Sequence, residues 1–151
     1  MRAWHAALAA CLLVVATSAV ACELVLSEHR SGAELKRLPL DAAQPEWRIA
    51  FEHSVLGTTV IDRYRFAHVA HLVEERFDGQ GYGLPHIAAP GEQLTRDGAG
   101  WRLQLDRVVQ PLVVRPLPQQ RMRLLLGGDE WLLGSFSAQA IEFQARGCPG
   151  P

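Results

Sequence analysis

The stretch WRIAFEHSVLGTTVIDRYRF, residues 47–66, contains two runs of alternating apolar and polar side chains, separated by a Gly-Thr pair at residues 57–58. A glycine and one further residue between two such runs are typical of a two-residue β-hairpin turn. Counting outwards from this turn predicts that His53 faces Asp62 across the hairpin. It also predicts one largely apolar, aromatic face and one charged face, as in an antiparallel sheet that is buried on one side.

His53 and Ser54 are neighbours, and together with Asp62 they contain the residue types of a Ser-His-Asp hydrolase. Consecutive side chains of a strand point to opposite faces, so Ser54 cannot reach the imidazole of His53 in the predicted register. The register also places Glu52 opposite Arg63, a favourable cross-strand charge pair. We therefore expect a non-enzymatic protein with a structural His53–Asp62 pair. A hydrolase that uses Ser54 and His53 is the alternative, and it requires a β-bulge at Ser54.

The same period-two alternation recurs along the chain, and no long helical periodicity competes with it. It predicts an all-β, single-domain antiparallel β-sandwich or barrel of about eight to nine strands. Strands are expected at Glu23–His29, Glu46–His53, Val60–His68, Leu72–Phe77, Trp101–Asp106, Arg121–Leu126, Glu130–Phe136 and Gln139–Ala145, with Val108–Arg115 as a further candidate at a sheet edge because of Pro111. The irregular stretch Asp78–Gly100 is rich in glycine and proline, and we expect it to be functional or mobile.

The N-terminus predicts export. Residues 1–21 contain one arginine near the start, an apolar run, and a small-x-small site ending at Ala21. This pattern is typical of a cleaved signal peptide, which would leave residues 22–151 as a single periplasmic β domain. The basic and acidic residues nearly balance, at 15 and 16, and form no basic cluster. We therefore expect no binding to nucleic acid.

Two cysteines remain after cleavage, Cys22 at the first mature position and Cys148 near the end. An even number of cysteines in an oxidising compartment favours a disulfide bond between them. The alternative is a lipoprotein in which the thiol of Cys22 is acylated, and only in that case do we expect membrane anchoring.

Metal and cofactor sites are not predicted. The segment from His68 to His86 contains several histidines and glutamates, but it lacks the spacing of known metal-binding motifs. The glycines that follow Asp78 do not match a phosphate-binding loop, because no helical pattern follows them. We expect no metal and no cofactor.

The segments WRIAFEHSVLGTTVIDRY (residues 47–64) and EERFDGQGYGLP (residues 74–85) together resemble the signature of a bacterial family, the domain-of-unknown-function family 1850. The resemblance extends from about Leu24 to Phe143. The positions that match are His53, Ser54, Val55, Asp62, Tyr64, Gly81, Gly83, Leu84 and Pro85.

This resemblance implies a small exported protein encoded beside TAXI-type tripartite ATP-independent periplasmic (TRAP) transporters. We therefore expect a non-enzymatic accessory or binding protein for transport of an organic anion, with the permease or the solute-binding protein as partner. The candidate contact surface is the stretch Asp78–Gly100 beside the hairpin end. A second interpretation is a small-ligand or metal-binding domain in which His53, Asp62 and Tyr64 line a pocket.

Overall fold

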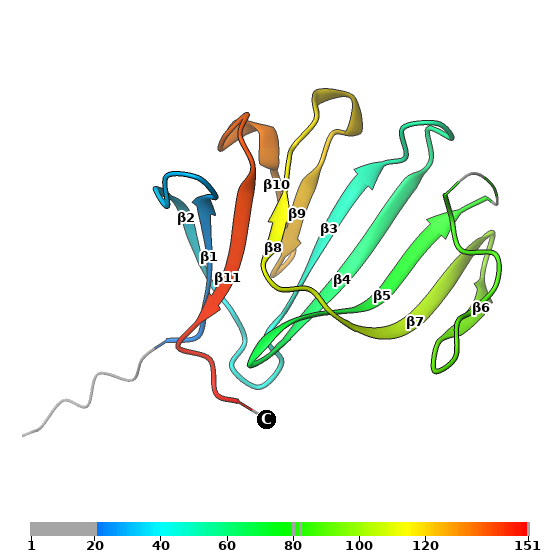
Figure 1. Cartoon of the computed structure of the whole chain (residues 1–151), viewed down its shortest axis with the longest axis horizontal. Coiled ribbons are helices and arrows are strands. Elements are labelled where there is room, and N and C mark those ends of the chain that lie inside the picture. The colour runs from blue at the N-terminus through cyan, green and yellow to red at the C-terminus, as the bar shows by residue number, and fades with distance from the viewer. Residues whose placement is uncertain (1–20, 80, 82, 151) are drawn as a thin grey trace, which may run out of the picture.

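The computed structural model describes residues 21–79, 81 and 83–150, and this part of the chain forms two antiparallel sheets that pack as a sandwich (Figure 1). The small sheet has the strand order β2-β1-β11-β8, and the large sheet has the order β10-β9-β3-β4-β5-β7-β6. The eleven strands of the described residues are β1 (Glu23–Glu28), β2 (Glu34–Pro39), β3 (Glu46–Glu52), β4 (Thr59–Ala67), β5 (Val69–Asp78), β6 (Gln93–Asp97), β7 (Gly100–Val108), β8 (Leu112–Val114), β9 (Arg123–Leu126), β10 (Asp129–Leu132) and β11 (Ile141–Arg146). The all-β sandwich is confirmed, and the closed barrel is wrong.

Two strands were not predicted, and both lie at sheet edges. β2 buries only Leu38 among its six residues, and β6 buries none, so neither carries a strong alternating pattern. β6 lies inside the stretch that the sequence predicts to be irregular. The predicted strand Glu130–Phe136 ends early, because the chain forms the 3₁₀ helix η2 (Leu133–Ser135). The predicted edge strand after Pro111 is confirmed as β8.

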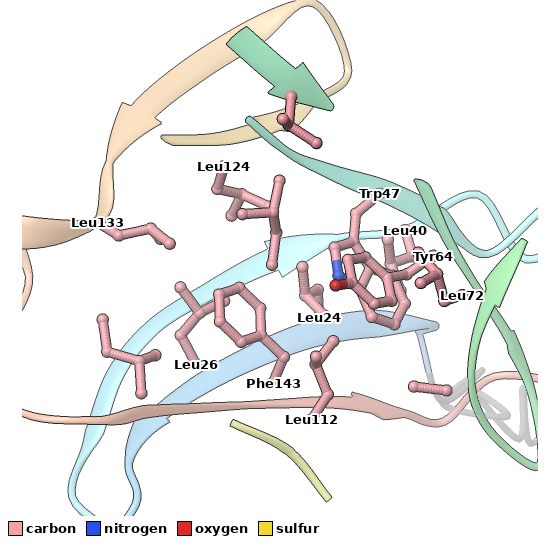
Figure 2. Close-up of a cluster of buried hydrophobic side chains, with 14 of the residues drawn as sticks. Leu24, Leu26, Leu40, Trp47, Tyr64, Leu72, Leu112, Leu124, Leu133 and Phe143 are labelled. Carbon is pink, nitrogen blue, oxygen red and sulfur yellow. The ribbon is translucent and has the colours of Figure 1, made fainter. Parts of the chain in front are cut away.

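The core lies between the two sheets (Figure 2). Leu24 and Phe143 of the small sheet point towards Trp47, Tyr64 and Leu124 of the large sheet. The rings of Trp47 and Tyr64 face each other across β3 and β4, with centroids 5.9 Å apart and planes inclined by 16°. Stacked aromatic pairs of this kind contribute about 0.5–1.5 kcal/mol beyond the area that they bury.

The Cys22–Cys148 disulfide joins the start of β1 to the segment after β11, and it confirms the predicted pairing. A sulfur in this bond cannot also carry a lipid, so the structure favours the disulfide over the lipoprotein. The predicted signal peptide falls almost wholly on residues 1–20, which lie outside the described residues, and it stays a prediction. Within the described part of the chain, no helix has the length and apolar character to cross a bilayer.

The β3–β4 hairpin has a different turn from the predicted one. The loop comprises the four residues 54–57, and His53 and Thr58 close it: the His53 N–H donates to the Thr58 carbonyl at 2.8 Å. The Gly57 N–H donates to the His53 carbonyl at 2.9 Å. Both turn types require a positive φ at Gly57, which is 66° here, so the glycine alone does not distinguish them.

The longer loop shifts the register by four residues. Asp62 lies opposite Ile49, and Arg63 lies opposite Arg48. The predicted His53–Asp62 and Glu52–Arg63 pairs are therefore wrong. Because four is an even number, every strand residue keeps its predicted face, and the apolar inner face that includes Asp62 is confirmed.

Candidate functional site

The hairpin turn is organised by the side chain of His53. Its Nδ1 atom accepts hydrogen bonds from the backbone N–H groups of Val55 and Leu56, both at 3.3 Å. An imidazole nitrogen that accepts must be unprotonated, so the neutral ring carries its proton on Nε2. His53 therefore acts like the aspartate or asparagine of an Asx turn, by binding the backbone two and three residues ahead.

The loop between β5 and β6, described at residues 79, 81 and 83–92, packs against this turn, and we call it the glycine loop. A Cβ atom added to Gly83 would lie 3.5 Å from Nε2 of His53, and one added to Gly81 would lie 3.6 Å from Cδ2 of Leu56. Both glycines have positive φ, 82° at Gly83 and 147° at Gly81. The structure therefore brings together two segments of the family signature that lie far apart in the sequence. We call the residues 53–57, 81 and 83–87 the tip–loop surface.

Leu84 anchors the loop. Its N–H donates to the carbonyl of Gly81 at 3.0 Å, and its side chain is buried in the main hydrophobic cluster. Pro85 follows directly and lines a shallow pocket on the loop together with Ile87. Glu92, at the far end of the loop, accepts a hydrogen bond from the backbone of Ala89 at 3.2 Å. Arg107 of β7 also donates to Oε1 of Glu92 at 2.9 Å, so the loop is attached to the rest of the protein both at Leu84 and at Glu92.

Ser54 is exposed at the first position of the turn. Within the described part of the chain, its hydroxyl makes no hydrogen bond to a histidine, and Nδ1 of His53 is already occupied by the turn backbone. The predicted nucleophile and base are therefore not assembled, and the hydrolase alternative has no geometric support.

Asp62 lies on the inner face of β4 beside Tyr64 and Glu75, and we call these three residues the acidic cluster. The Tyr64 hydroxyl donates to its Oδ2 atom at 3.2 Å, while its Oδ1 atom is shielded from solvent and has no partner in the described residues. Glu75 of β5 lies directly opposite in the sheet. Sequence reasoning missed Glu75, although the position of Asp62 on an apolar face already indicated an unusual carboxylate.

Burial is the main cause that raises the pKa of Asp62 to about 7, and the negative charge of Glu75 adds to it. The hydrogen bond from Tyr64 opposes this shift. Burial also raises the pKa of Glu75, against the opposing charge of Arg107 and with a further contribution from Glu92. The cluster can therefore exchange a proton near neutral pH.

The structure gives His53 and Asp62 different surroundings, so the interpretation that places both in one ligand pocket gains no support from it. His53 contacts the turn and the glycine loop, whereas Asp62 is enclosed with Tyr64 and Glu75. Among the described residues, no three His, Cys, Asp or Glu side chains are grouped so that they could hold a metal ion. His71 instead pairs with Asp106.

The family Domain of unknown function (DUF1850) matches residues 48–133, a range that contains the turn, the glycine loop and the acidic cluster. No match was found among curated proteins, and none among solved structures. Because the match covers more than half of the sequence, the chain belongs to the DUF1850 family.

Proposed function

We propose that this protein is a non-enzymatic periplasmic accessory of a TAXI-type TRAP transporter, and that it binds the permease or the solute-binding protein through the tip–loop surface. The single observation that carries the proposal is the convergence of the hairpin turn and the glycine loop. His53 contributes its ring, which accepts from the turn backbone. Gly81 and Gly83 contribute positive φ angles and close contacts with the turn.

The tip–loop surface exposes two large apolar side chains beside the polar Ser54 and His86. Val55 at the turn is 65% exposed, and Ile87 on the loop is 74% exposed. Single exposed apolar residues are common on proteins, whereas apolar residues that form a contiguous patch mark contact sites for other proteins, and the proposal takes Val55 and Ile87 as parts of one patch. A rigid surface also loses little conformational entropy when it binds.

The compartment is supported by the disulfide, which persists in oxidising environments. The proposed organic-anion transport and the choice of partner rest on the family resemblance. The signature residues lie at one surface of the protein and do not form a catalytic group, which agrees with contact to a transporter protein.

The test is site-specific photo-cross-linking in cells that produce the full chain and the neighbouring transporter. A photoreactive amino acid replaces Val55 or Ile87, and a third variant places it at Val108 as a matched control. Val108 is 60% exposed and lies on β7 opposite His71, away from the hairpin turn. We expect cross-links to the permease or the solute-binding protein from Val55 and Ile87 but not from Val108. The absence of cross-links, or equal cross-linking at Val108, contradicts the proposal.

A further inference from the structure

A second concave site lies away from the tip–loop surface, between the connection from β8 to β9 and the end of β10. Its volume is about 460 Å³, within the range of small-molecule pockets. One wall comprises Pro116, Leu117 and Pro118, and Met122 and Leu132 add further apolar surface. We call this site the proline pocket. Prolines restrict the backbone of the wall, so the pocket is present before any ligand binds.

Apolar side chains are unusually exposed here. Leu117 is 37% exposed and Leu132 is 49% exposed, and they are two of the five large apolar side chains that are exposed in the described part of the chain. A ligand that covered both would remove apolar surface from water, which stabilises a complex.

The polar groups of the proline pocket carry an excess of positive charge. Arg123 donates from Nη1 to Glu130 at 3.2 Å, but its Nε atom is shielded from solvent and has no partner among the residues that the structure describes. Arg121 is exposed at the pocket and makes no ion pair among the described residues. Two guanidinium groups thus face one carboxylate, and one buried donor stays unused.

We infer that the proline pocket binds an amphipathic organic anion, a carboxylate with an apolar tail. The tail packs against the proline and leucine walls. The carboxylate accepts hydrogen bonds from Arg121, because a guanidinium group binds a carboxylate in a planar, two-point geometry, and the positive charge of Arg123 on the same pocket adds to the attraction. This inference does not depend on the proposed transporter contact.

Calorimetric titration of the full mature protein with octanoate, and in parallel with 1-octanol, tests the class of ligand. We expect saturable octanoate binding and about tenfold weaker binding of the uncharged alcohol. Arg121→Glu should weaken octanoate binding by about tenfold, whereas Arg30→Glu, an exposed arginine in the β1–β2 turn, should not. Equal binding of the two compounds, or no saturable octanoate binding, overturns the inference.

Gly134 provides a test of the location. It lines the pocket, its φ is not positive, and an added Cβ meets no atom within 4 Å. A phenylalanine there fills open space without backbone strain, so Gly134→Phe should fold with an unchanged Tm and lose octanoate binding. Ala42→Phe, at an exposed position in the β2–β3 turn, should bind octanoate normally. Unchanged octanoate binding by a folded Gly134→Phe variant contradicts the location. If this variant does not fold, the comparison of Arg121→Glu with Arg30→Glu decides the location.

Discussion

The imidazole of His53 lies against Gly83, so that a Cβ atom on the glycine would lie 3.5 Å from Nε2. The opposite ring nitrogen, Nδ1, accepts from the turn backbone. One side chain therefore holds the hairpin turn and supports the glycine loop. The two segments of the family signature meet at this ring. The ability of the ring to accept hydrogen bonds, rather than its charge, explains why a histidine stands at position 53.

Replacing His53 tests the acceptor role. His53→Ala removes the acceptor for two backbone N–H groups and should lower the free energy of unfolding by about 1 kcal/mol. His53→Asn should retain most of this stability, because an amide oxygen can accept from the same backbone groups. Urea denaturation measures both. Ser54→Ala is the control and should change the stability by less than about 0.5 kcal/mol. Equal losses for the alanine and asparagine variants at position 53 would contradict the acceptor role.

Gly83 should not tolerate a side chain, and the reason is the backbone. Its φ of 82° is unfavourable for residues with a Cβ atom, whereas the 3.5 Å approach to His53 is an ordinary contact. Gly83→Ala should therefore lower the free energy of unfolding by about 1–2 kcal/mol. Gly134→Ala, at a residue without positive φ, is the matched control and should be neutral or slightly stabilising. Thermal unfolding of the two variants distinguishes them, and similar Tm values would argue against backbone strain at Gly83.

Asp62 should make the stability depend on pH. Burial raises its pKa to about 7 from an ordinary value of 3.8, so the folded protein holds this proton more tightly than the unfolded chain does. The linked stability is fully present below about pH 4 and is lost as the pH rises through 7. At about 1.4 kcal/mol per pKa unit, the loss amounts to a few kcal/mol. Asp62→Asn should remove it.

Urea denaturation at a series of pH values between 4 and 8 measures this effect as the difference between wild type and variant. The advantage of Asp62→Asn over wild type should grow as the pH rises. Asp129→Asn, at an exposed position at the start of β10, should follow the wild-type pH curve. If the asparagine variant at position 62 keeps the wild-type slope, Asp62 does not titrate with a raised pKa.

The disulfide should contribute strongly to stability, because 126 residues separate Cys22 from Cys148. For a loop of this length, the chain-entropy account gives about 4–5 kcal/mol. The double variant Cys22→Ala with Cys148→Ala should lose this amount in urea denaturation under oxidising conditions. Reductant should destabilise the wild type and leave the double variant unchanged. Insensitivity of the wild type to reductant, with reduction verified by intact mass, would contradict the prediction.

Particular residues show how far sequence patterns can predict the fold. The strand alternation around Trp47 and Tyr64 correctly identified the buried face, because side-chain direction in a strand depends only on position. The edge strands β2 and β6 escaped prediction, since an edge strand buries few side chains and its pairing depends on the neighbouring strand. The signature residues of the candidate site were recognised from the sequence, but Glu75 and the contact between His53 and Gly83 were not.

The sequence by itself determined the all-β class, the inner and outer faces of the strands, and the pairing of Cys22 with Cys148, because each follows from local alternation or from the number of cysteines. Only the tertiary structure decided the register of β3 and β4 and the surroundings of Asp62. A turn of two residues and one of four give the same faces, and both accept the positive φ of Gly57. What distinguishes them is the ring of His53, which binds the turn backbone on one side and packs against a glycine thirty residues later in the sequence on the other.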